Sequence, residues 1–149
     1  MKRLFIVFIN SKEEVEKLNT YVIESSDIPN NFNYTINSYS GNTLNNLNSI
    51  LKYKEDGWIF FTLGDEFIST YLIDKLSTLL YANSSDVITL PKSLFVNNKW
   101  VNRQDPNYQT RICKISNDLV FKNKEKPTIY NYKSETILQE REYSLYEIK

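Results

Sequence analysis

The stretch D-G-W-I-F-F-T-L-G-D-E-F-I-S, residues 56–69, decides the fold class of this chain. Its residues 58–63 form an apolar run of the kind found in strands that are covered on both faces. Gly64, Asp65 and Glu66 end the run, and leucines at positions 72, 76, 79 and 80 then recur at helical spacing. The pattern predicts a buried strand, an acidic turn and a helix, with another strand over residues 86–90.

Two similar units precede this strand. Residues 4–9 are a second apolar run, and Ser11 with Glu14 three residues later has the form of a capping box that opens a helix. Residues 32–38 alternate apolar and polar side chains, which predicts a strand, and Thr43 can cap the helix after it. Strands that alternate with helices through short links predict crossovers and a parallel sheet in an α/β fold.

The sequence after Pro91 changes character. Short aromatic and β-branched runs are separated by N-N-K, N-R-Q-D-P-N and S-N-D, which predicts hairpins and antiparallel strands. Residues 134–149 are predicted to close as a helix, because four of their side chains fall nearly in helical register: Ile137, Leu138, Arg141 and Leu145. At 149 residues the chain has the length of one domain. We expect a parallel half over residues 1–90 and hairpins over residues 91–133.

The composition excludes several classes of function. Lys and Arg number 18 and Asp and Glu number 18, so no net charge favours binding to nucleic acid. The chain has no His and one Cys, which excludes an internal disulfide, a Cys-His zinc site and Ser-His or Cys-His catalysis. No segment approaches the roughly 20 apolar residues of a membrane span, and we expect a cytoplasmic location.

Asp65 and Glu66 are the candidate site that the residues themselves indicate. Ligands of open parallel sheets bind at the carboxyl ends of the strands, and this acidic pair follows a strand there. Two adjacent carboxylates can hold a hard divalent cation together with water and ligand phosphates. The alternative is an acidic turn that leads into a helix, where negative charge is favoured for electrostatic reasons alone.

Four segments of the chain resemble family 2 glycosyltransferases. Residues 56–69 are similar to the strand that runs into the acidic metal motif of that family. The first strand and helix of the family resemble residues 5–18, F-I-V-F-I-N-S-K-E-E-V-E-K-L. A later strand and hairpin resemble residues 87–100, V-I-T-L-P-K-S-L-F-V-N-N-K-W. The stretch often written P-D-Y-Q-x-R-L resembles residues 105–114, D-P-N-Y-Q-T-R-I-C-K. The resemblance covers most of residues 1–122. It implies a GT-A-like, Rossmann-like domain of three layers, with a mainly parallel central sheet and an antiparallel C-terminal portion.

The resemblance also implies an activity, which is transfer of a sugar from a nucleotide-sugar donor to an acceptor. Asp65, with Glu66, would hold Mn²⁺ or Mg²⁺ against the donor diphosphate as the glycosidic bond breaks. Arg111 would add a contact to a phosphate. Asp105 is the candidate general base for the acceptor hydroxyl, and Asn10 is a candidate contact to the nucleotide.

Structural alternatives stand beside these roles. Arg111 can equally be a strand residue paired with a surface carboxylate, and Asn10 can serve simply as a turn residue after the first strand. Trp100, in a polar hairpin, is the candidate platform for stacking a sugar, whereas Trp58 belongs to a buried strand. Cys113 has no basic neighbours in the sequence and is assigned to packing.

The chain departs from the family pattern at two positions that matter for catalysis. Leu63 stands where the family has the first Asp of its metal motif, and no His is present at all. The segment between Tyr39 and the next helix is also short. The alternative function is therefore a GT-A-like domain without catalysis that serves as a binding or structural component and has a partner in an assembly.

Overall fold

A computed structural model describes residues 2–97, 99–101 and 107–148 of the chain. Three strands form the parallel half of its sheet: β1 (Lys2–Ile9), β2 (Phe32–Tyr39) and β3 (Gly57–Leu63). β1 lies between the other two, and it pairs with both in parallel register. The parallel arrangement predicted from the alternation of strands and helices is confirmed for these three strands.

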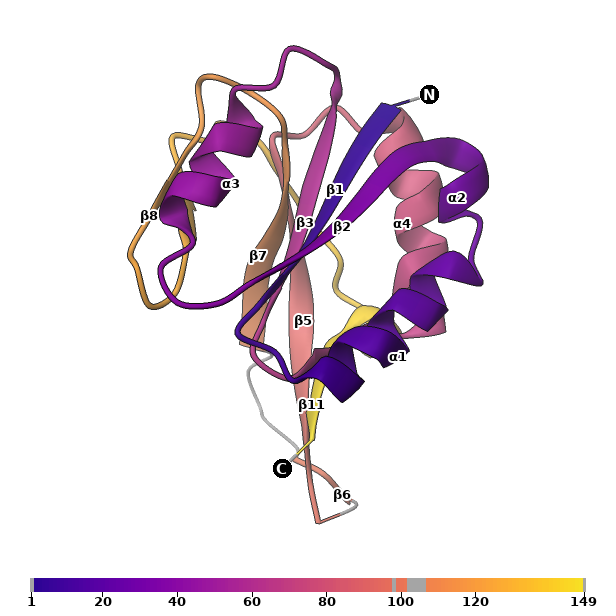
Figure 1. Cartoon of the computed structure of the whole chain (residues 1–149). Helices are drawn as coiled ribbons and strands as arrows, with labels where there is room; N and C mark the ends of the chain where they lie inside the picture. Colours follow the sequence, from indigo (N-terminus) through magenta and orange to yellow (C-terminus); the bar gives the residue numbers. More distant parts are fainter. Residues whose placement is uncertain (1, 98, 102–106, 149) are drawn as a thin grey trace.

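The connections between these strands lie on opposite faces of the sheet. α1 (Glu13–Glu24) and α2 (Ile28–Asn31) join β1 to β2 on one face, and α3 (Leu44–Leu51) joins β2 to β3 on the other. α4 (Thr70–Ala82) follows β3 and packs on the same face as α1 (Figure 1). Ser69 caps α4, because its hydroxyl accepts a hydrogen bond from the N–H of Leu72 at 3.1 Å.

The second half of the sheet is mixed. β7 (Asn107–Lys114) runs antiparallel between β3 and β5 (Val87–Val96), and β6 (Lys99–Trp100) folds back on the end of β5. β11 (Leu145–Ile148) is parallel to β5 and antiparallel to the short β4 (Glu66–Phe67). The strand order is β2-β1-β3-β7-β5-β11-β4. Two short strands, β8 (Val120–Lys122) and β9 (Thr128–Tyr130), form a separate hairpin.

The predicted C-terminal helix is wrong. Residues 135–148 form β10 (Glu135–Ile137), a 3-10 turn η1 (Arg141–Tyr143) and β11. β10 and β11 both pair with β5, whose backbone groups on that side would otherwise lack partners. Pairing with a strand distant in sequence therefore overrides the near-helical spacing of the side chains, which is only a weak preference.

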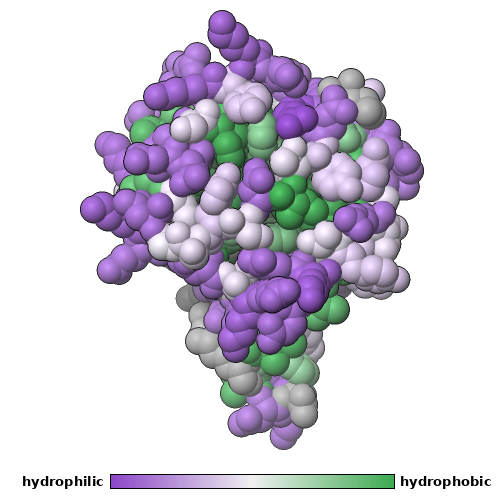
Figure 2. Space-filling model, in the orientation of Figure 1, coloured by the Kyte–Doolittle hydropathy of each residue, from purple (hydrophilic) through white to green (hydrophobic). Residues whose placement is uncertain are grey.

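The core is divided by the sheet into two apolar clusters. Alternate residues of β1 supply both: Leu4, Ile6 and Phe8 face α1, α2 and α4, while Phe5, Val7 and Ile9 face α3 and the β8–β9 hairpin. The domain therefore has three layers, as the resemblance implies. Its surface in the same view is mainly hydrophilic (Figure 2). No helix in the described ranges has the length and apolar character that crossing a membrane requires.

Candidate functional site

The carboxyl ends of β1, β2 and β3 meet at one edge of the sheet, above the β5–β6 hairpin in Figure 1. Asn10 follows β1, its N–H donates to the Tyr39 carbonyl at 2.9 Å, and its side-chain oxygen accepts from the N–H of Gly41 at 2.9 Å. Gly64 follows β3 and donates to the carbonyl of Ile9 at 2.8 Å. Asn10 thus lies at the expected edge, where it joins the segment after β1 to the segment after β2.

Asp65 is the accessible member of the acidic pair, with 35% of its side chain exposed. Its Oδ1 accepts a hydrogen bond from the N–H of Lys12 at 2.9 Å, and its Oδ2 lies 3.7 Å from Lys12 Nζ. Lys12 occupies the position before the first turn of α1. These contacts fasten the loop after β3 to the start of α1, and they leave the carboxylate open to solvent.

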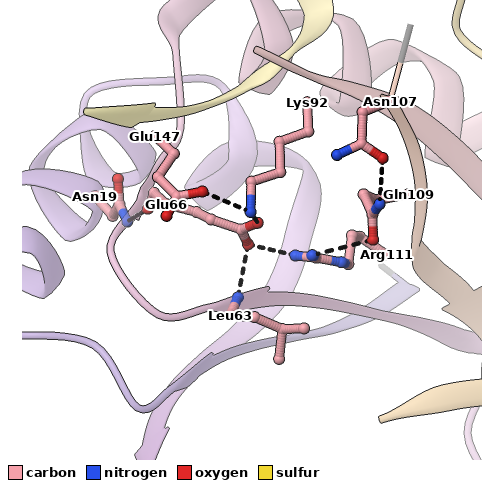
Figure 3. A network of polar contacts seen from close by, with 8 residues as sticks. All are labelled: Asn19, Leu63, Glu66, Lys92, Asn107, Gln109, Arg111 and Glu147. Atoms are coloured by element: carbon pink, nitrogen blue, oxygen red, sulfur yellow. Dashed lines mark hydrogen bonds and ion pairs between the residues drawn. The ribbon is translucent and has the colours of Figure 1, made fainter. Parts of the chain in front are cut away.

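Glu66 has the opposite environment, because it is 0% exposed. Its Oε1 accepts from the N–H of Leu63 at 2.6 Å and forms an ion pair with Arg111 (Figure 3). Its Oε2 lies 3.0 Å from Lys92 Nζ, which is also 2.9 Å from Oε2 of Glu147. The carboxylate of Glu66 is therefore engaged by the protein on both oxygens. We call Glu66, Arg111, Lys92 and Glu147 the charged network.

The charged network joins β4, β5, β7 and β11 at the candidate site. Arg111 extends from β7 with only 3% of its side chain exposed, and its guanidinium lies 5.6 Å from the ring centre of Phe61. Burial alone would lower the pKa of Lys92, but the hydrogen bond to Glu147 and the charge of Glu66 outweigh it and raise that pKa. Arg111 is thus a strand residue paired with a carboxylate, as the alternative to phosphate binding predicts. The carboxylate is buried, however, whereas that alternative predicts one at the surface.

Asn19 is a polar residue at this site that the sequence reasoning missed. It is buried on α1, where its amide donates to the carbonyl of Glu66 at 2.9 Å and accepts from the N–H of Ile68 at 2.9 Å. Both backbone groups of the segment around β4 are satisfied in this way. A signal was available, since Asn19 lies four residues after Val15 and four before Ile23 on the buried face of α1.

The acidic pair does not fit a divalent cation held between both carboxylates. Lys92 and Arg111 already neutralise the carboxylate of Glu66, and they would repel a metal cation placed beside it. Within residues 2–97, 99–101 and 107–148, no group of three or more acidic or Cys side chains is placed to hold a metal ion. Asp65 alone offers an accessible carboxylate, and binding of Mn²⁺ or Mg²⁺ there stays a prediction.

Trp100 lies in β6, on the β5–β6 hairpin that extends beyond the same edge (Figure 1). It is 44% exposed, and its ring packs against Phe95 and Tyr146 with centroids 4.7 and 5.1 Å apart. The guanidinium of Arg141 lies 5.1 Å from its ring centre. Stacking of a sugar on Trp100 stays a prediction, and Asp105 lies outside the described residues.

Comparison with known proteins identifies a class of fold. No protein-family model and no curated protein matches the chain. Among solved structures, the crystal structure of S. aureus TarS 1-349 is similar, with a TM-score of 0.61 and 15% sequence identity over 99% of this chain. This chain spans 60% of the length of that TarS chain. Because TarS is a GT-A-type glycosyltransferase, the similarity shows a glycosyltransferase-like fold.

Proposed function

We propose that this chain binds a nucleotide-sugar donor at the carboxyl ends of β1, β2 and β3 and transfers the sugar to an acceptor. The observation that carries the proposal is the glycosyltransferase-like fold over 99% of the chain. Asp65 supports the proposal, because it is an accessible carboxylate directly after β3, and ligands of parallel sheets usually bind at that edge.

Asp65 and Lys12 have the chemistry to contact such a donor. A carboxylate accepts hydrogen bonds from sugar hydroxyls, and the exposed ammonium of Lys12, 3.7 Å from Asp65, would lie beside the diphosphate of the same donor. Positive charge at that position stabilises a departing diphosphate as the glycosidic bond breaks. We assign these roles to Asp65 and Lys12, because Arg111 is buried against Glu66 and not available to a phosphate.

A second candidate function is a binding or structural component without catalysis. The observation that favours it is the charged network, in which Lys92 and Arg111 neutralise one of the two acids that the resemblance assigns to a metal. A domain that has lost catalysis can retain such acids for folding, since an ion pair inside the protein does not require a substrate. This function requires a partner in an assembly.

The decisive experiment compares the wild-type chain with Asp65→Asn and with the matched control Asp56→Asn. Asp56 precedes β3 at the opposite edge of the sheet and is largely exposed, so its substitution makes the same chemical change away from the site. Binding of nucleoside diphosphates is measured by calorimetry with and without Mn²⁺. Hydrolysis of a panel of nucleotide sugars is measured on the same samples.

If sugar transfer is the function, the wild type binds at least one nucleotide and hydrolyses its sugar conjugate. Asp65→Asn should then lose at least about tenfold in hydrolysis, while Asp56→Asn retains the wild-type rate. Nucleotide binding that does not change when Mn²⁺ is added would agree with the poor fit of the acidic pair to a metal. Binding without any hydrolysis supports the second candidate. If the wild type shows no binding and no hydrolysis, the result contradicts the proposal.

A further inference from the structure

A cavity of about 280 Å³ lies beside β7, separate from the acidic pair. It is formed between the amino-terminal half of β7 and the segment 126–132, which contains β9. Its volume is just below the range of about 300–1,000 Å³ that is usual for small-molecule sites. The side chains that give it its chemistry are Tyr108, Gln109, Arg111, Lys126, Thr128 and Tyr132.

The lining combines aromatic rings with neutral hydrogen-bonding groups. Tyr108 and Tyr132 are 37% and 40% exposed, so each tyrosine has surface available to a ligand. Gln109 is held in place, because its amide donates to Asn107 Oδ1 at 2.8 Å and its oxygen lies 3.5 Å from Arg111. Sugars offer apolar C–H faces for aromatic rings and hydroxyls for amide and hydroxyl groups, so this lining suits a saccharide.

The charge of the lining argues against a nucleoside diphosphate in this cavity. Arg111 is neutralised by Glu66, which leaves Lys126 as the lining cation without an ion-pair partner among the described residues. Apart from this one exposed ammonium and the paired Arg111, the side chains named in the lining are neutral hydrogen-bonding groups. The cavity therefore matches an uncharged or weakly charged ligand.

The cavity lies on the side of the molecule where an acceptor could reach the proposed donor site. β7 is antiparallel to β3, and Ile112 pairs with Phe60, so residues 107–111 extend toward the edge at which Asp65 follows β3. Arg111 belongs both to the cavity lining and to the charged network, where it contacts Glu66 next to Asp65 (Figure 3). The two sites are thus joined through one buried side chain.

We propose that the cavity between β7 and residues 126–132 binds a saccharide, and that this saccharide is the acceptor for the proposed sugar transfer. The acceptor role rests on the proposed function, whereas saccharide binding can be tested without any donor. Tyr108 and Tyr132 are the residues that would contact the sugar rings, and Gln109 would bind a hydroxyl.

The test is binding of oligosaccharides to the full chain, measured by NMR titration and calorimetry. The probes are hexasaccharides of glucose and of N-acetylglucosamine, together with uridine diphosphate. The variants are Tyr108→Ala, Tyr132→Ala and Tyr132→Phe. The matched control is Tyr81→Ala, because Tyr81 is an exposed tyrosine on α4, on the opposite face of the sheet.

We expect at least one oligosaccharide to bind, and each alanine variant in the cavity to weaken it by about tenfold. Tyr132→Phe keeps the ring and should retain most of the affinity, and Tyr81→Ala should retain all of it. Binding of the oligosaccharide in the absence of any nucleotide separates this proposal from the donor site. Absence of binding to every oligosaccharide, unchanged binding in both alanine variants, or loss of uridine diphosphate binding in them would overturn the proposal.

Discussion

Replacing Glu66 by Gln is expected to lower the free energy of unfolding by about 3–5 kcal/mol, because it breaks a buried ion pair and leaves one charge without a partner. Glu66 is completely buried, and Arg111 would remain inside the protein facing a neutral amide. The charge of Lys92 contributes less to this destabilisation, since Lys92 is partly exposed and keeps its ion pair with Glu147. Most of the expected loss in the free energy of unfolding therefore comes from the buried guanidinium of Arg111, which would lack a charged partner.

The measurement is urea denaturation followed by circular dichroism and by the fluorescence of the buried Trp58. For a domain of this size, 1 kcal/mol corresponds to about 2–4 °C in Tm, so we expect Tm to fall by about 6–20 °C. Asp65→Asn is the matched control, because it makes the same change from acid to amide one residue earlier. Its partly exposed contact with Lys12 is expected to contribute at most about 1 kcal/mol.

A double-mutant cycle separates loss of the ion pair from loss of packing. Glu66→Leu combined with Arg111→Met removes both charges, and the double variant should be more stable than either single variant. The reasoning is refuted if Glu66→Gln is within about 1 kcal/mol of the wild type, or if it is no more destabilising than Asp65→Asn.

Three further expectations concern other parts of the chain. Gly57→Ala should destabilise by about 3 kcal/mol in urea denaturation, because a Cβ atom there would lie 2.2 Å from the backbone oxygen of Arg3. The hydrogen bond with Lys114, together with backbone N–H donors, lowers the pKa of Asp86 below 3.8. The ionised carboxylate therefore stabilises the folded state fully above pH 3.8, and this stabilisation is lost as the pH falls through the folded-state pKa. The unfolding midpoints of wild type and Asp86→Asn should therefore differ near neutral pH and converge in acid. Burial raises the pKa of Cys113, so a thiol reagent should modify it only at the rate of unfolding, and rapid labelling of the native chain would contradict this.

The strands of the parallel half could be predicted because their signal is local. Apolar runs and short links are sufficient to identify β1 and β3, and the structure confirms both. The face of α1 is harder to predict, since Val15, Leu18 and Val22 recur at helical spacing in its sequence. The structure buries Val15 with Asn19 and Ile23 and leaves Leu18 55% exposed. The spacing of Asn19 to Val15 and Ile23 is compatible with this face, but the contacts of its amide with backbone groups around β4 have no local signal.

The candidate site was only partly predictable for the same reason. Asp65 and Glu66 are adjacent acids after a strand, and nothing in their immediate sequence indicates which of them is buried. The difference arises from Arg111 and Lys92, which reach Glu66 from β7 and β5. Lys92 carried no sequence signal, because a single lysine in a strand is most often a solvated residue.

The position of β11 between β5 and β4 has a consequence for how the chain is made. β11 follows both of its partners by a long stretch of sequence, so the loops that its pairing closes are long and form slowly. Until residues 145–148 have left the ribosome, one side of β5 has unpaired backbone groups next to a buried apolar segment. Aggregation of the incomplete chain should therefore begin at β5, a central strand of the finished sheet, and not at its polar edge strand β2.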